Sequence, residues 1–404
     1  MTKNNNIPQG YKDSPLGIIP EGWEVKSVKD FGKVLTGSTP PTSDQDNYGV
    51  DFLFVSPADL SDRKFITSTE KKLSIKGFSI SRVMPKGTVL FTCIGSTIGK
   101  SGIASTNLTS NQQINAVICN KHNYNEFLYY ELCYKSSRIK LIAGEQAVPI
   151  INKSDFENIK IIHPPLPEQQ KIAEILSVWD EAIEKQTQLI AQFATRKRGL
   201  MQQLLTGKKR VKGFGGKWEE VKLGDIATFF SGGTPNTNIS EYYVGDIPFI
   251  KSGEIHKSHT EQFISKEALS KSSAKLVEKE DILYALYGAT SGECAISQIY
   301  GAINQAVLCI RTMENRKFIL SVLQSNKQHY LDSYLQGGQG NLSAEIVKSY
   351  SLKLPSPKEQ TAIANILSAA DSEITLAKQK LARLKEQKKG LMQVLLTGKK
   401  RVKI

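Results

Sequence analysis

The stretch that decides the fold occurs twice in the chain. It reads Gly199-Leu-Met-Gln-Gln-Leu-Leu-Thr-Gly-Lys-Lys-Arg-Val-Lys212 and returns as Gly390-Leu-Met-Gln-Val-Leu-Leu-Thr-Gly-Lys-Lys-Arg-Val-Lys403. The copies differ only at Gln203 against Val394, and the alignment extends without a gap over 168–212 and 359–403 at a constant offset of 191 (359 − 168). The chain is therefore a tandem duplication in which both repeats end in the same tail.

The segments that precede the two tails also correspond, but more loosely. Trp23 to Pro40 aligns with Trp218 to Pro235, and Asn111-Gln112 aligns with Asn304-Gln305. The tails are nearly identical, whereas the preceding segments share only framework positions. We therefore expect two domains that perform different versions of one task on a symmetric frame.

Each tail is predicted to form one long helix. Both open after prolines, carry a glutamate in the first turn (Glu168 and Glu359), and then run free of proline for nearly forty residues. Gly207 and Gly398 follow the last apolar residues and favour a helix end there. Apolar residues recur at heptad spacing in between. The predicted core positions are Leu176, Trp179, Ile183, Ile190, Phe193, Leu200 and Leu204 in the first tail, and Leu367, Ile374, Leu381, Leu384, Leu391 and Leu395 in the second.

Two helices of equal length bury such stripes most simply against each other, as an antiparallel coiled coil. Lys197 and Lys388 interrupt the stripes at matching places. At 1.5 Å per residue, the helix over 168–205 spans roughly 57 Å, about 17 base-pair steps of duplex DNA, so the helices are suited to act as a ruler. A dimerisation or filament coiled coil explains the tails equally well, but it does not explain the units before them.

The units before the tails are predicted to be loop-rich α+β domains. Short apolar or alternating runs broken by Gly, Asn, Ser and Pro indicate strands. The predicted strands are 52–55, 88–94, 114–119 and 159–162 in the first unit, and 247–250, 282–286, 306–310 and 349–354 in the second. Three-to-four spacing of apolar residues indicates one helix in each unit, over 125–143 and 316–335.

The domain boundaries follow from this pattern. We expect a flexible N-terminus at 1–14, globular domains at 15–163 and 213–354, and helical tails at 164–212 and 355–404. The 404 residues, 40% of them hydrophobic, suffice for at least two cores.

Charge and cysteine usage narrow the functional classes. Lys and Arg number 53 against 39 Asp and Glu, and the resulting +14 is spread along the chain, which favours a polyanionic partner, above all double-stranded DNA. Solubility alone also accounts for a basic composition.

The five cysteines lie far apart in apolar runs and indicate a reducing compartment. Without a signal region or an apolar span, we expect a cytoplasmic protein with no membrane contact.

Loops that return at matching positions in both units are the best candidates for DNA contact. Neutral polar side chains at the tips of a rigid scaffold read base edges, and basic neighbours hold phosphates. The neutral candidates are Thr36, Ser38, Thr39, Gln112 and Gln113, with Ser231, Thr234, Asn304 and Gln305. The basic candidates are Lys76, Arg82, Lys100, Lys251, Lys271 and Lys275. The structural alternative for each is that the turn fixes a loop or that the side chain satisfies buried backbone.

The sequence contains no recognisable catalytic motif. Gly95 to Ser101 resembles a phosphate-binding loop but is one residue short, and its counterpart, Gly288 to Cys294, has a glutamate in place of the lysine. His256 and His259 are the closest histidine pair and lack a third nearby ligand. We therefore expect a non-catalytic chain with no metal or cofactor of its own.

With these features the chain resembles the specificity subunits of type I restriction-modification enzymes over essentially its full length. The likeness rests on the Trp-Glu entry with Gly-x-Thr-Pro in both repeats, on Pro165-Leu-Pro-Glu-Gln-Gln-Lys-Ile-Ala173 with its echo at 357–364, and on the duplicated Gly-Leu-Met-Gln-x-Leu-Leu-Thr-Gly-Lys. It implies two pseudo-symmetric target recognition domains, separated by the two antiparallel helices. Each domain would read one half of a bipartite, asymmetric site, and the helices would set the unread gap.

The resemblance also implies partners. Two methyltransferase subunits would bind S-adenosylmethionine and methylate adenine N6, and restriction/translocase subunits would use ATP and Mg. Two other hypotheses fit the residues: a stand-alone DNA-binding protein, and a coiled-coil scaffold whose domains bind no DNA.

Overall fold

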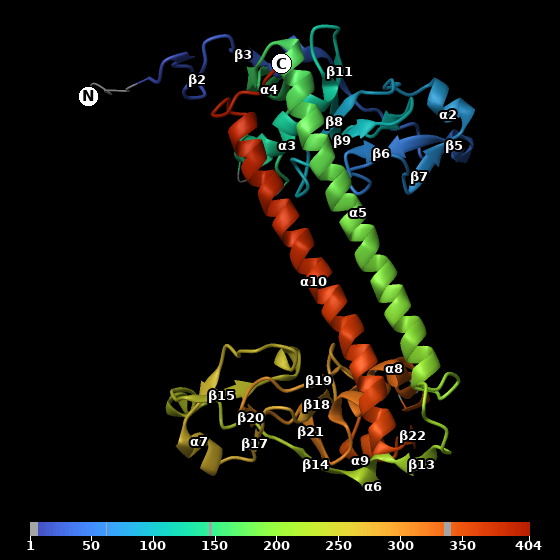
Figure 1. Ribbon diagram of the computed structural model, residues 1–404. Coiled ribbons are helices and arrows are strands. Elements are labelled where there is room, and N and C mark those ends of the chain that lie inside the picture. Colours follow the sequence, from blue (N-terminus) through green and yellow to red (C-terminus); the bar gives the residue numbers. More distant parts are fainter. Residues whose placement is uncertain (1–6, 62, 145–147, 335–340) are drawn as a thin grey trace. The chain divides into compact units, whose positions relative to one another are not determined.

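The computed structural model describes residues 7–61, 63–144, 148–334 and 341–404. The chain divides into two compact units (Figure 1). Unit 1 consists of 1–187 together with 380–404, and unit 2 consists of 188–379. Residues 380–404 therefore belong to the first unit, although they follow the second globular domain in the sequence.

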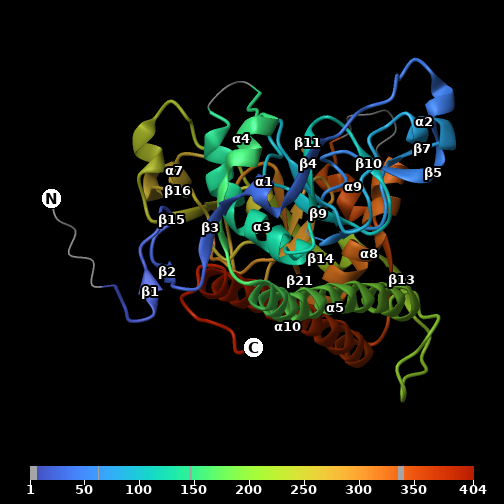
Figure 2. The same ribbon diagram turned by 90° about the horizontal axis from the view of Figure 1, so that it is seen from above.

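Unit 1 is built around a sheet with the strand order β4-β11-β8-β9-β6. These strands are β4 (Gly32–Thr36), β6 (Phe65–Ile66), β8 (Val89–Thr92), β9 (Ser101–Ala104) and β11 (Ile114–Cys119). A smaller sheet contains β10 (Thr109–Ser110), β5 (Tyr48–Val55) and β7 (Lys71–Leu73), and two strand pairs join β1 (Tyr11–Lys12) to β2 (Ile19–Pro20) and β3 (Glu24–Ser27) to β12 (Lys160–His163). The helices are α1 (Val28–Phe31), α2 (Ile75–Ser79), α3 (Asn125–Ile142) and α4 (Lys153–Asn158), and α3 packs on β8 and β9 (Figure 2).

Unit 2 repeats this plan. One sheet orders β14 (Ala227–Ser231), β21 (Val307–Thr312), β18 (Ile282–Ala285) and β19 (Cys294–Ile296). The other orders β16 (Phe263–Ile264), β15 (Ile247–Ile250), β20 (Gly301–Ile303) and β17 (Lys275–Val277), and β13 (Glu219–Lys222) pairs with β22 (Ser351–Leu354). The helices are α6 (Leu223–Ile226), α7 (Lys266–Ser270), α8 (Arg316–Tyr334) and α9 (Ala344–Lys348).

The strand pairings of the two units correspond. β4 pairs antiparallel with β11, as β14 does with β21, and the parallel pair β5 and β10 has its counterpart in β15 and β20. The expected α+β class and the duplication are confirmed. The predicted strands 114–119 and 247–250 coincide with β11 and β15. Within the N-terminus expected to be flexible, Tyr11–Lys12 form β1, and residues 1–6 lie outside the described residues.

Each globular core is completed by the tail of the other repeat. The core of unit 1 contains Trp23 and Phe127 together with Leu395 and Leu396 from the end of the chain. The core of unit 2 contains Leu204 and Leu205 from the first tail. Because these leucines are buried in the domains, each domain is anchored to a helix end by apolar burial of several kcal/mol, at roughly 1.5–3 kcal/mol for each fully buried side chain.

The predicted tails are two helices of 39 residues each, α5 (Leu166–Leu204) and α10 (Pro357–Leu395). Within unit 1, the start of α5 runs beside the end of α10, where Lys388 pairs with Asp180. Within unit 2, Lys197 Nζ lies 2.5 Å from Asp371 Oδ1. The two pairs are equivalent at the offset of 191, so the lysines predicted as interruptions are the bridges between antiparallel helices.

The predicted heptad positions lie on the inward faces of the helices. Leu176 and Leu395 are buried in the core of unit 1, and Leu204 and Leu367 in that of unit 2. The other predicted positions are half-buried: Trp179, Ile183, Ile190, Phe193, Leu200, Ile374, Leu381, Leu384 and Leu391. Among the described residues, no helix is both long and apolar enough to cross a membrane.

Candidate DNA interface

The Gly-x-Thr-Pro turn follows β4 in unit 1 and β14 in unit 2, and its first glycine is fixed by crowding. A Cβ on Gly37 would lie 2.1 Å from the carbonyl oxygen of Asn111, and one on Gly232 would lie 1.7 Å from that of Ile303. Neither position accommodates a side chain without moving backbone. The turn is therefore held against the loop that carries the Asn-Gln pair in each unit.

The same threonine and glutamine meet in both units. Thr39 Oγ1 donates to Gln112 Oε1 at 2.6 Å, and Thr234 pairs with Gln305 in the same way. All four side chains are exposed, so each unit presents one neutral polar pair at its surface. The sequence analysis named all four residues as candidates for DNA contact, and the structure adds that they pair within each unit.

Four further candidates of unit 1 lie around this pair. The Arg82 guanidinium donates to the carbonyl oxygen of Thr36 at 2.9 Å, and the Arg82 backbone N–H donates to Ser38 Oγ at 2.9 Å. Gln113 Oε1 accepts from Asn111 Nδ2 at 2.9 Å. Arg82 is thus held by the Gly-x-Thr-Pro turn, while its side chain remains exposed.

The remaining candidates of unit 2 are more dispersed. Ser231 ends β14, and Asn304 Oδ1 accepts from the backbone N–H of Ala306 at 3.1 Å, so Asn304 fixes its own loop. Lys275 Nζ lies 5.9 Å from the centre of the Phe230 ring, which is within cation–π range.

Two of the basic candidates are neutralised by carboxylates. Lys76 Nζ lies 2.8 Å from Asp44 Oδ2, and Lys271 Nζ lies 2.7 Å from Glu267 Oε1. Hydrogen bonding to these carboxylates raises the pKa of both lysines. A cation that is already paired gains less from a phosphate, so we expect Lys76 and Lys271 to contribute less to phosphate binding than the unpaired lysines.

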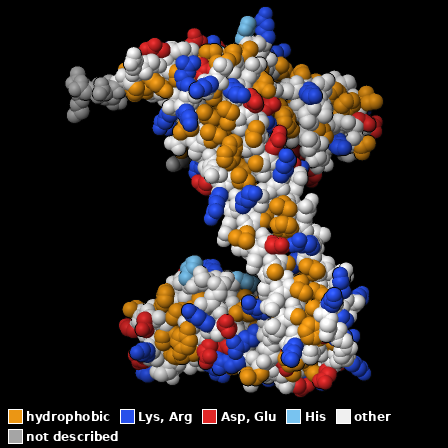
Figure 3. All heavy atoms as spheres, in the orientation of Figure 1, with side chains coloured by type: hydrophobic (Ala, Val, Ile, Leu, Met, Phe, Trp, Pro, Cys, Tyr) orange, Lys and Arg blue, Asp and Glu red, His pale blue; other side chains and the backbone are white. Residues whose placement is uncertain are grey.

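The other three candidate lysines are available for contact with phosphates. In the described part of the chain, no carboxylate lies within ion-pair distance of Lys100, Lys251 or Lys275, and all three side chains are exposed. On the face that Figure 3 shows, Lys and Arg side chains are scattered among neutral and acidic ones. Positive charge is therefore spread over this face, as it is along the sequence.

The outward side chains of the two units differ where the backbone agrees. The short helices α2 and α7 are both capped by serine, with Ser74 Oγ accepting from the N–H of Gly77 and Ser265 Oγ from that of Ala268. Two exposed positions of these helices differ between the units. Ile75 of α2, which is 73% exposed, corresponds to Lys266 of α7, and the exposed Lys76 corresponds to the exposed Glu267. One frame thus presents two different surfaces.

A repeated polar corner was missed by the sequence prediction. In unit 1, Arg401 pairs with Glu168, which is 1% exposed, and Trp23 Nε1 donates to the same carboxylate at 3.1 Å. In unit 2, Glu359, also 1% exposed, receives Arg210 Nη2 at 2.6 Å and Trp218 Nε1 at 3.3 Å. The signal was available, because all three residue types recur between the repeats.

The loop that resembles a phosphate-binding loop is explained by backbone geometry. Gly95 and Gly99 have φ of +90° and +100°, and Gly288 and Gly292 have φ of +84° and +78°. These values favour glycine. The shared feature is therefore a glycine turn. No group of three metal-ligating side chains occurs among the residues that the structure describes.

Comparisons with known proteins agree with this geometry. The family model for the type I restriction modification DNA specificity domain matches residues 20–192 and again 215–386. The MjaIX specificity subunit of Methanocaldococcus jannaschii is 28% identical over 340 residues, 78% of each chain. The HindI specificity subunit of Haemophilus influenzae is 34% identical over 151 residues, 36% of this chain and 33% of that one. The crystal structure of the S subunit from M. genitalium, 17% identical, covers 98% of both chains with a TM-score of 0.61 and shows the same fold.

Proposed function

Because the chain belongs to the type I restriction modification DNA specificity family, we propose that it is the DNA-recognition subunit of a type I restriction-modification complex. The observation that carries the proposal is the pair of like-folded units with different outward side chains. Two related but unequal readers recognise a site of two unequal halves. The recognised sequence is therefore bipartite and asymmetric, unlike the palindromes bound by twofold dimers.

Recognition divides between neutral and basic side chains. The pairs Thr39 with Gln112 and Thr234 with Gln305 are exposed at the surface of each unit and are suited to hydrogen bonds with base edges. Lys100, Lys251 and Lys275 supply sequence-independent contacts to phosphates, which weaken as salt rises.

The helices α5 and α10 set the unread gap between the two half-sites. Their equal length of 39 residues and their matched ion pairs support a spacer of defined length. The duplication also supports two equivalent docking places for one kind of partner.

In this proposal the partner subunits carry out the methylation and restriction reactions. Two methyltransferase subunits, carrying S-adenosylmethionine, extrude and methylate the target adenine at N6, and restriction/translocase subunits use ATP and Mg. The chain itself binds no cofactor and acts where the DNA lies, in the cytoplasm.

Modification-sensitive long-read sequencing tests the proposal. DNA is compared from cells that express the chain with its methyltransferase partner and from cells that express the partner alone. We expect N6-methyladenine at one asymmetric two-part motif only when the chain is present. Assembly of the complex without any methylated motif would contradict a targeting role and favour the scaffold hypothesis.

A further inference from the structure

The turn that ends each long helix is covered in unit 1. A Cβ on Gly398 would lie 2.4 Å from Pro20 Cδ and 3.0 Å from Trp23 Cζ3, so the proline packs directly on the turn beside the indole. The Tyr11 hydroxyl donates to the carbonyl oxygen of Gly398 at 3.0 Å. The hairpin of β1 and β2 thereby closes this corner, and Trp23 is completely buried.

The equivalent turn in unit 2 is open. The atoms nearest to a Cβ on Gly207 belong to Trp218 and lie 3.6 Å away, and Trp218 is only half-buried. A pocket of about 840 Å³ occupies this corner. It is lined by Thr206, Gly207, Arg210, Lys217, Trp218, Glu219, Glu220, Val221 and Lys353.

The sequence explains the difference. At the offset of 195 that aligns Trp23 with Trp218, Pro20 corresponds to Gly215. A Cβ on Gly215 would meet no atom within 4 Å, so among the described residues Gly215 does not cover the turn as the proline ring does in unit 1. The second repeat has kept the turn and the tryptophan but not the segment that covers them.

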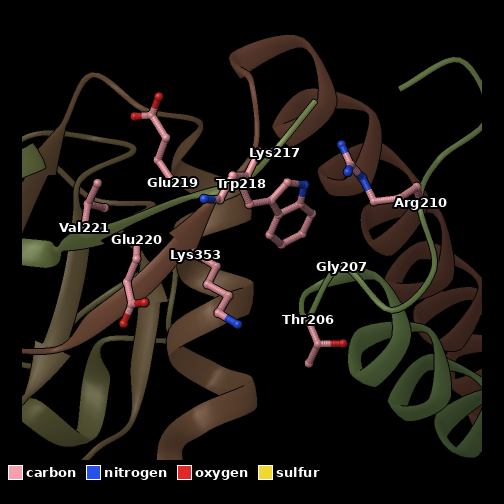
Figure 4. A pocket seen from close by; sticks show the side chains of 9 residues that line it. All are labelled: Thr206, Gly207, Arg210, Lys217, Trp218, Glu219, Glu220, Val221 and Lys353. Atoms are coloured by element: carbon pink, nitrogen blue, oxygen red, sulfur yellow. The ribbon is translucent and has the colours of Figure 1, made fainter. Parts of the chain in front are cut away.

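The pocket is fixed in shape by the corner described above. Arg210 is held by Glu359 and by the carbonyl oxygen of Gly216 at 2.8 Å, and its guanidinium lies 5.6 Å from the centre of the Trp218 ring. Figure 4 shows the indole facing Arg210 and the Gly207 turn, with Lys353 reaching in from β22. The aromatic face is therefore pre-formed, and binding on it orders little further structure.

We infer that this pocket binds an extended, proline-bearing segment of a partner subunit, seated on Trp218 and Gly207 as Pro20 is seated in unit 1. Proline rings suit aromatic-lined grooves, because their backbone is already restricted and little entropy is lost. The charges that line the pocket balance, because Glu219 and Glu220 accompany Lys217 and Lys353. The packing of the proline ring on the indole therefore carries the recognition, rather than charge. The existence of a partner subunit rests on the proposed function.

A peptide with the sequence of residues 8–21 serves as the first probe. It carries Pro20 and Tyr11, which contact the Gly398 turn in unit 1. Titration of the full-length chain by calorimetry should show binding to the wild type, and Thr206→Trp, which fills the pocket, should weaken it at least about tenfold. Gln192→Trp adds the same bulk to an exposed position of α5 and should bind like the wild type. A peptide with alanine in place of Pro20 should bind weakly to all three.

A crosslinking experiment then identifies the occupant in the assembled complex. A photoreactive side chain at Lys353 should crosslink to a proline-containing segment of the methyltransferase partner, and mass spectrometry locates that segment. No binding of the wild-type peptide, equal binding by Thr206→Trp, or a crosslink to a second copy of this chain or to DNA would overturn the inference. Peptide binding needs neither DNA nor methylation, so a failure of the proposed function is told apart from a failure of this site.

Discussion

At the scale of single residues, the two polar corners attach each domain to its helix. Glu168 and Glu359 are each buried against an arginine and a tryptophan from distant parts of the chain. Removing one carboxylate leaves an indole N–H and a guanidinium without their acceptor, and the loss of charged hydrogen bonds costs more than that of neutral ones.

The first prediction concerns these corners. We expect Glu168→Ala and Glu359→Ala each to lower the free energy of unfolding by about 1–3 kcal/mol. Glu174→Ala is the control, because its ion pair with Lys171 is exposed and should contribute less than ~0.5 kcal/mol. Urea unfolding measures all three variants. Equal midpoints for Glu168→Ala and the control would show that the corner is not a fastening point.

The second prediction concerns the basic side chains. Lys100→Ala and Lys251→Ala should each weaken DNA binding by the assembled complex on all sequences and reduce the dependence on log salt concentration by about one. Lys76→Ala and Lys271→Ala should leave both unchanged, because carboxylates already neutralise these lysines. Fluorescence anisotropy across a salt series measures the slopes. A loss confined to Lys76→Ala and Lys271→Ala would refute the assignment.

The third prediction concerns the pH dependence of the free energy of unfolding that arises from Glu131 in α3. Glu131 is fully buried, and burial raises its pKa from 4.5 to about 7 although Lys135 Nζ lies 3.2 Å from its carboxylate. Between these values the folded chain keeps a proton that the unfolded chain releases, so this residue lowers stability progressively as pH rises from about 4.5 to 7.

The variant Glu131→Gln tests this, because its side chain cannot titrate. Its stability relative to the wild type should therefore rise across this window, by up to ~1.4 kcal/mol per pKa unit. Urea unfolding between pH 4 and 8 tests this, and parallel profiles would contradict it.

At the scale of elements, the two long helices show why the sequence pattern predicted their position well. Heptad spacing, the flanking prolines and the glycines after the last apolar residues are local signals, and α5 and α10 occupy the residues that these signals predicted. The ends of the apolar stripes differ, since Leu204 and Leu395 are buried in globular cores as well. A heptad pattern shows that a face is apolar but not what covers it.

The fourth prediction follows from the helices as a spacer. Insertion of one heptad after Gln188 in α5, and another after Gln379 in α10, lengthens each helix by ~10.5 Å. The unread gap of the recognised site should grow by about three base pairs, while both half-sites stay the same. The methylated motif reports the gap directly. An unchanged gap would show that the helices do not set it.

The candidate site was predictable only in part, and the reason is the long range of side-chain pairing. Thr39 and Gln112 could be selected from the sequence, because both recur in the repeats, but their hydrogen bond could not. The neutralisation of Lys76 by Asp44 could not, since neither residue has an equivalent in the second unit to mark it. Charge alone identifies a basic residue but not its partner.

At the scale of the whole molecule, duplication is the central fact. Two copies of one supersecondary plan keep the glycine turns, the serine caps and the Trp-Glu-Arg corners, while exposed positions such as Ile75 and Lys266 have diverged. Conservation of the frame with divergence of the surface is what two readers of different half-sites require.

The measurement that tests this account most directly is an exchange of one reader. The globular segment 15–163 is replaced by the corresponding segment of another specificity subunit, and the adenine methylation motif is read by long-read sequencing with the same methyltransferase partner. The account predicts that one half of the motif changes while the other half and the gap are retained. A motif in which both halves change, or in which neither does, would contradict the assignment of one half-site to each unit.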